Sequence, residues 1–199
     1  MREAIVHSCN AYFGQLAVDL GADALVDTAA ISGISVGSAP SGSAAARSRL
    51  RATLPQAGYG QGDVVVTPLR MARVAAAVAS DGMLRQTRVE IGGAPPARGD
   101  MLLRPHAARM LARYMREAVV TGTGRGLANH PWRIAGKTGT AEVTGTASHS
   151  WFVGFAPYGR ATKRVAFAVI IENAGYGSVA AVPVAGEIVS AAASAGLIK

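Results

Sequence analysis

The last third of the chain constrains the fold most strongly, because its apolar residues change from helical spacing to the spacing of β-strands. Segments 132–143, 150–156 and 164–173 predict three consecutive strands joined by short, turn-rich connections. Neighbouring strands with short connections pair antiparallel, so the three predict a meander. The apolar segment 179–195 predicts a final helix that lies across this sheet.

The first two thirds of the chain predict mainly helices. Near the N-terminus, apolar residues at helical spacing end at Gly21, and a turn is possible at 8–10. Farther along, Thr67 followed by Pro68 has the pattern of an N-cap and first helical residue. The expected elements are helices at 5–20, 22–30, 68–80 and 104–120, loops at 32–48 and 92–99, and an exposed strand at 83–91.

Length and composition predict one domain. The chain has 199 residues, half of them hydrophobic, which is enough for one sizeable core. Neither an internal repeat nor a domain-separating linker interrupts it. The expected fold class is therefore α+β, a single unit over residues 1–199 with its helices before the meander.

The formal net charge of +8 raises the question of an anionic partner. The arginines are scattered, and the densest group, Arg47, Arg49 and Arg51, has no interleaved aromatic residues. No nucleic-acid partner is therefore expected. The single Cys9 and the four histidines show no metal-ligand spacing, so neither a metal nor a cofactor is expected.

The N-terminus shows no export signal. Residues 1–10 include Arg2, Glu3 and His7 where a signal peptide would have an apolar core. The longest apolar runs also fall far short of the roughly 20 residues that cross a bilayer. Neither a signal nor a transmembrane segment is expected in this chain.

The sequence AGKTGTAEV at 135–143 contains a lysine that could hold a phosphate, hold a carboxylate, or be an ordinary exposed strand residue. A phosphate-binding loop has a glycine five residues before the glycine of G-K-T, but Pro131 stands there and offers no N–H group. The residues after Thr138 also favour strand or turn over the helix that such a loop requires. The carboxylate and the exposed-strand interpretations remain open on this segment alone.

Distant motifs favour the carboxylate interpretation. K-T-G at 137–139 and S-x-N at 8–10 occur in the order in which penicillin-binding proteins carry two of their three active-site motifs. The chain resembles the transpeptidase domain of class B penicillin-binding proteins along its whole length. Further segments carry this resemblance: G-Q-G at 60–62, T-P-L at 67–69, G-T-G at 122–124 and SWFVGFAP at 150–157.

The resemblance implies a fold and an activity. The fold would be the C-terminal part of a penicillin-binding protein/serine β-lactamase-like transpeptidase domain, with helices, a three-stranded antiparallel meander and a C-terminal helix packed on it. The activity would be that of a D,D-transpeptidase, which cross-links peptidoglycan stem peptides ending in D-Ala-D-Ala through an acyl-enzyme and is acylated by β-lactams. Members of the family are anchored in the cell membrane and act on its outer face.

The resemblance also implies roles for individual residues. Ser8 would pass a proton toward the leaving amine, and Asn10 would hold the substrate and the catalytic lysine of the family. Lys137, with the hydroxyls of Thr138 and Thr140, would bind the substrate carboxylate. The N–H of Thr140 would be one oxyanion-hole donor, for which Gly139 leaves room.

The nucleophile motif of the family, S-x-x-K, does not occur in this chain. Its lysines, Lys137, Lys163 and Lys199, follow Ile134, Arg160 and Gly196 by three positions. The acyl-enzyme cannot then form by the family's route, and the chain is expected to be inactive alone. Ser8 is not expected to replace the nucleophile, because the resemblance places it away from attack distance of the scissile carbonyl.

Three hypotheses follow for the chain as a whole. It is an incomplete transpeptidase domain, a non-catalytic module that binds cell-wall peptides or a divisome or elongation partner, or one half of a split enzyme whose S-x-x-K half is separate. Because the family's nucleophile helix is buried, a chain without it is expected to be marginally stable, aggregation-prone or dependent on a partner.

Overall fold

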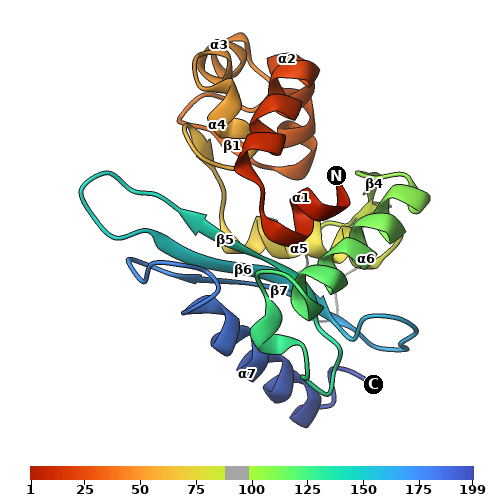
Figure 1. Cartoon of the computed structure of the whole chain (residues 1–199). Helices are drawn as coiled ribbons and strands as arrows, with labels where there is room; N and C mark the ends of the chain where they lie inside the picture. The colour runs from red at the N-terminus through yellow and green to blue at the C-terminus, as the bar shows by residue number, and fades with distance from the viewer. Residues whose placement is uncertain (88–98) are drawn as a thin grey trace.

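The computed structural model describes residues 1–87 and 99–199, and its centre is a three-stranded sheet (Figure 1). Strands β5 (Ala135–Ala141), β6 (His149–Ala156) and β7 (Val165–Ile171) pair antiparallel in the order β5-β6-β7. The register places Lys137 opposite Val153 on β6. The predicted meander is confirmed.

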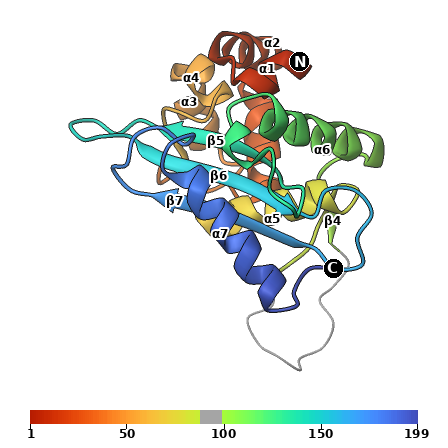
Figure 2. The same cartoon turned by 60° about the horizontal axis from the view of Figure 1, so that its bottom comes forward.

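Helices cover the two faces of this sheet. Helix α7 (Ala181–Ser194) packs against β6 and β7 from one side, as Figure 2 shows. Helices α5 (Pro68–Ala79) and α6 (Pro105–Val120) pack from the other side, and the short η1 (Arg125–Leu127) connects α6 to the sheet.

The two sides of β6 supply separate parts of the core. Phe152 is fully buried toward α7 and stacks on Phe167 of β7, with ring centroids 6.0 Å apart. Phe155, three residues on and therefore on the opposite face, packs with Val78 and Met115 of α5 and α6. Each such buried side chain contributes about 1.5–3 kcal/mol.

The N-terminal segment forms a helical lobe above the sheet in Figure 1. Gly21, at φ 79°, breaks the second helix where the sequence predicted an end. The lobe has its own small core around Val26 and Leu50. Its elements are α1 (Arg2–His7), α2 (Asn10–Ser32), β1 (Ser35–Val36), α3 (Ala44–Ala52), α4 (Leu54–Gly58) and β2 (Val64–Val65).

The loop predicted for residues 32–48 is wrong in part. Residues 44–48 belong to α3, because the Ser43 side chain accepts a hydrogen bond from Ala46 N and caps an alanine-rich helix. Strand β1 lies in the same segment and pairs with β2. By contrast, the Thr67 cap and the start of α5 at Pro68 are confirmed, since Thr67 Oγ1 accepts from Arg70 N.

Of the strand predicted for 83–91, the structure describes residues 83–87. Within these, β3 (Met83–Leu84) pairs with β4 (Asp100–Met101), and residues 85–87 are not in a strand. Residues 88–91, and most of the loop predicted for 92–99, lie outside the described residues. In the described part of the chain, no helix has both the length and the apolar character needed to cross a membrane.

Candidate active site

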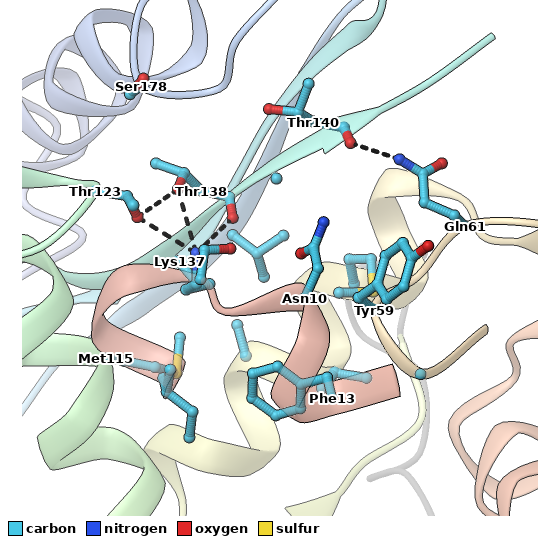
Figure 3. A pocket seen from close by; sticks show the side chains of 18 of the residues that line it. Asn10, Phe13, Tyr59, Gln61, Met115, Thr123, Lys137, Thr138, Thr140 and Ser178 are labelled. Atoms are coloured by element: carbon cyan, nitrogen blue, oxygen red, sulfur yellow. Dashed lines mark hydrogen bonds between the residues drawn. The ribbon is translucent and has the colours of Figure 1, made fainter. Parts of the chain in front are cut away.

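A cavity of about 660 Å³ lies between the helical lobe and β5, the edge strand of the sheet (Figure 3). Its β5 side is polar, and the side formed by α5 and α6 is apolar, with Val74, Val78, Leu111 and Met115. All six residues that the sequence marked as site residues line it: Ser8, Asn10, Lys137, Thr138, Gly139 and Thr140. Distant motifs therefore meet in one place.

The Lys137 ammonium group is held by two threonines. Its Nζ donates to Thr138 O at 3.0 Å and lies 3.3 Å from both Thr138 Oγ1 and Thr123 Oγ1. The Thr138 hydroxyl donates in turn to Thr123 Oγ1 at 2.6 Å. Figure 3 shows the three side chains converging on the cavity. The amine is therefore aimed by neutral oxygen atoms.

Lys137 carries a positive charge that this part of the chain does not neutralise. It forms no salt bridge with any residue in 1–87 or 99–199. Burial lowers its pKa from 10.5 to about 8, since a partly desolvated ammonium is disfavoured. The group is still mainly protonated at pH 7, so the site favours an anionic ligand.

The S-x-N motif forms a turn between two helices. Ser8 ends α1 in the left-handed conformation, at φ 59°, and Cys9 precedes the first residue of α2, Asn10. This turn places Ser8 and Asn10 on the cavity wall. Among the described residues, no hydrogen bond joins either side chain to Lys137.

The turn at 122–124 ties this wall to the lysine. Thr123 N donates to Val6 O at 3.3 Å, while its hydroxyl holds Lys137. A Cβ at Gly122 would lie 2.2 Å from Val6 O, so only glycine permits this approach. The sequence indicated G-T-G only as a segment shared with the family, and Thr123 was not predicted as a site residue. A polar residue between two glycines was the available signal.

A second missed residue, Gln61, bonds to the edge of β5. Its Nε2 donates to Thr140 O at 3.0 Å, and its Oε1 accepts from Glu142 N at 3.2 Å. Both bonds lie on the side of β5 away from β6. In antiparallel pairing the N–H and C=O of one residue point to the same side. The N–H of Thr140 therefore also points away from β6, toward the cavity edge.

The loop after β7 also contacts β5 and holds Thr140 in place. Gly177 N donates to Thr140 Oγ1 at 3.3 Å. A Cβ at Gly177 would lie 2.3 Å from Gly139 O, so a side chain there would push the loop off the strand. Thr140 is thus fixed through two acceptors, its carbonyl and its hydroxyl oxygen, and its N–H has no acceptor among the described residues.

The described residues contain no group of three His, Cys, Asp or Glu side chains that could hold a metal ion. The site consists instead of one ammonium, several hydroxyls, one asparagine and outward-facing amides. Such a set binds a carboxylate or a carbonyl oxygen.

Comparison with known proteins gives a match over nearly the whole chain. Residues 1–190 match the family described as the penicillin binding protein transpeptidase domain. Peptidoglycan D,D-transpeptidase PbpA of Mycobacterium tuberculosis is 33% identical over 192 residues, covering 87% of this chain and 38% of that protein. The chain thus spans well under half the length of this relative.

Two solved structures have the same fold. The D,D-transpeptidase domain of a peptidoglycan glycosyltransferase from Eggerthella lenta matches with a TM-score of 0.77 and 26% identity, over 98% of this chain and 54% of that one. Penicillin-binding protein A from M. tuberculosis, as its imipenem acyl-enzyme complex, matches with a TM-score of 0.75 and 31% identity, over 96% of this chain and 46% of that one. The α+β architecture predicted from the sequence is confirmed.

Proposed function

This chain belongs to the penicillin-binding protein transpeptidase family, and we propose that it forms the substrate-binding part of a peptidoglycan D,D-transpeptidase active site. Residues 1–199 would then be one incomplete transpeptidase domain. Its ligand would be a stem peptide that ends in D-Ala-D-Ala. Part of the active site lies on these residues, and the nucleophile lies on a segment outside them.

The observation that carries the proposal is the cation at the edge of β5. Lys137 has no carboxylate partner among the described residues and lies beside the hydroxyl of Thr138, in a cavity large enough for a dipeptide end. A C-terminal carboxylate would neutralise the ammonium and accept from the Thr140 hydroxyl, and from the Thr138 hydroxyl once that group turns away from Thr123 Oγ1. Hydrogen bonds to a charged group contribute about 1.5–3 kcal/mol each.

The remaining site residues fit the chemistry that would follow. The N–H of Thr140, which points away from β6, would donate to the oxygen that becomes negative when the peptide carbonyl is attacked. Ser8 and Asn10 lie on the other wall, where a hydroxyl could pass a proton to the leaving amine and an amide could orient the peptide.

The apolar part of the cavity supports a missing segment. Protein interiors are normally close-packed, yet the half-buried Val74 and Leu111 line an unfilled space that the buried Val78 and Met115 border. We infer that a segment bearing Ser-x-x-Lys packs here and brings the nucleophile to the carboxylate site. The chain alone would not form an acyl-enzyme. The assembled enzyme would be acylated by β-lactams, as penicillin-binding protein A from M. tuberculosis is acylated by imipenem.

Peptide titration tests the binding site. An N-acyl peptide ending in D-Ala-D-Ala should bind the wild-type chain, and Lys137→Ala should weaken it about 10- to 100-fold. Lys163→Ala is the matched control, because the Lys163 amine bonds only to Gly196 O at 3.4 Å among the described residues. The same peptide with a C-terminal amide should bind as weakly to wild type as the acid binds to Lys137→Ala. Absence of saturable binding to wild type would refute the proposal.

A second candidate is a non-catalytic module that binds cell-wall peptides or a partner protein, favoured by a complete set of carboxylate-binding groups without S-x-x-K. Labelled penicillin separates the two. If a separate polypeptide bearing S-x-x-K is acylated only when this chain is present, the chain is part of an enzyme. Binding of peptide with no such acylation supports the module. Labelling of the pure chain at Ser8 would overturn its expected inactivity.

A further inference from the structure

The cavity wall carries two charges of opposite sign. Of the described residues that line it, Lys137 and Glu142 are the two with charged side chains. Lys137 lies on β5, and Glu142 directly follows Ala141, the last residue of that strand. The cavity therefore has a positive group and a negative group along the same edge.

The two charges do not neutralise each other. The Lys137 ammonium is held at Thr138 O, and about 13 Å of extended chain separates Thr138 from Glu142. That distance exceeds the Debye length of about 8 Å at physiological ionic strength. Within 1–87 and 99–199 the Glu142 side chain forms neither a salt bridge nor a hydrogen bond. Each charge is thus available to a ligand.

The position of Glu142 is fixed through its backbone. Its N–H donates to Gln61 Oε1 at 3.2 Å, and Gln61 Nε2 donates to Thr140 O, a contact that Figure 3 shows. In an extended strand the carbonyl of one residue and the N–H two residues later point to the same side. Glu142 therefore continues the line of β5, and the order along the edge is Lys137, Thr140, Glu142.

This order matches the order of groups in a peptide end. With the terminal carboxylate at Lys137 and the preceding carbonyl near the N–H of Thr140, the upstream residues would run toward Glu142. A residue two positions before the terminal one lies about 7 Å farther along, and a side chain of lysine length adds about 6 Å. An ammonium group at the tip of such a side chain would lie beside the Glu142 carboxylate.

The reaction of a transpeptidase supplies a second source of the same group. Transfer of the acyl group forms a new amide bond, so an amine of another peptide must enter the cavity. That amine is an ammonium ion before it gives up its proton. The two sources therefore share one chemistry, an alkylammonium group.

We propose that Glu142 is a specificity residue of this site, which binds an ammonium group about 13 Å from the carboxylate that Lys137 binds. The cavity then selects a ligand by two charges of opposite sign at a set separation. The inference rests on the proposed function, which places the carboxylate at Lys137. It adds a second charged contact at the other end of the ligand.

A pair of peptides tests this contact. The probes are N-acetyl-L-lysyl-D-Ala-D-Ala and the same peptide with norleucine, which has the same alkyl chain without the amine. At low salt the wild type should bind the lysine peptide about three- to fivefold more tightly, the factor for an exposed ion pair. In Glu142→Gln this preference should disappear while the affinity for the norleucine peptide stays unchanged. In Glu142→Lys the norleucine peptide should bind more tightly.

Glu172→Gln is the matched control and should keep the wild-type preference. Glu172 is an exposed acid that directly follows β7, at the same end of the sheet as Glu142. It does not line the cavity, and it forms no salt bridge with the described residues.

A second titration identifies the source of the ammonium group. D-alaninamide, which has an amine and no carboxylate, is added to the chain saturated with the norleucine peptide. If the group belongs to the attacking peptide, D-alaninamide should bind this complex, and Glu142→Gln should weaken its binding about three- to fivefold. The lysine and norleucine peptides should then bind the wild type equally well.

The outcomes separate this inference from the proposed function. If Glu142→Gln alters neither the peptide preference nor the binding of D-alaninamide, the inference is overturned, and the proposed function stands as long as Lys137→Ala weakens both peptides. If Glu142→Gln weakens both peptides equally, Glu142 has only a structural role, which also overturns the inference. If the wild type binds neither peptide, the proposed function and the inference both fail.

Discussion

The two faces of the sheet differ in how fully this chain covers them. Toward α7, Phe152, Phe167 and Val169 form a closed core with the helix. Toward the helical lobe, Val153 lines a cavity of about 660 Å³. The same strand β6 supplies both faces, so the difference lies in what is packed against it. The face toward α7 is closed along its length. The other face is closed at Phe155, which packs with Val78 and Met115, and is hollowed beside Val153 and Lys137.

The largest expected effect is on the closed face. Phe152→Ala should lower the free energy of unfolding by about 3–5 kcal/mol, because the ring is fully buried and stacked on Phe167. Domains of this size are stable by only about 5–15 kcal/mol in total. Urea denaturation of the pure chain measures the change.

Two valines of equal size, one on each face of the sheet, test this difference in packing. Val169→Ala on the closed face should cost about 2 kcal/mol. Val153→Ala should cost less, about 1–1.5 kcal/mol, because its side chain is nearly as buried (9% exposed against 6%) but borders the cavity, so truncation there loses fewer contacts. Equal costs would mean that the cavity face is as tightly packed as the other.

The next effect concerns the charge on the open face. The pKa of Lys137 is about 8 when folded and near 10.5 when unfolded, so between these values the unfolded chain binds more protons. Stability should therefore rise with pH through this window, by up to about 3 kcal/mol. Below about pH 8 the lysine is charged in both states, and its desolvation cost is constant.

Comparison with Lys137→Met isolates this effect, because the other titrating groups are common to both proteins. Unfolding free energies should be measured at intervals from pH 7 to pH 10.5. As the pH rises, the free energy of unfolding of the wild type should increase relative to that of Lys137→Met. If the two free energies change in parallel with pH, the lowered pKa of Lys137 is contradicted. The affinity for the peptide should change in the opposite direction. Binding of its carboxylate needs the charged ammonium of Lys137, so the affinity should weaken above about pH 8.

The sequence predicted the closed face better than the open one, for a physical reason. The three strands and α7 follow from local periodicity, which short segments carry by themselves. The loop predicted for 32–48 was partly wrong because a single cap at Ser43 starts a helix in a stretch whose glycines and serines suggest a turn. In such a segment the residues that favour a turn compete with the residue that caps a helix.

The site was predictable as a set of residues but not as a network. K-T-G and S-x-N identified both walls of the cavity, since these motifs have a recognisable order. Gln61 and Thr123 were missed as site residues because their bonds to Thr140 and Lys137 span 79 and 14 residues and depend on how the helical lobe is placed against β5. Spacing within a motif holds no information about such a contact.

The smallest expected effect is on the network that aims Lys137. Thr123→Val keeps the shape of the side chain and removes the oxygen that accepts from both Lys137 and Thr138. The free energy of unfolding should fall by about 1 kcal/mol, the net value of a typical hydrogen bond. The pKa of Lys137 should fall below about 8, because the charged form loses an acceptor.

Thr146→Val, in the exposed β5–β6 hairpin, is the control and should change neither quantity. The pH at which peptide affinity is halved reports the pKa. If that pH stays at the wild-type value in Thr123→Val, the lysine is held by β5 alone, and the turn at 122–124 only positions α1.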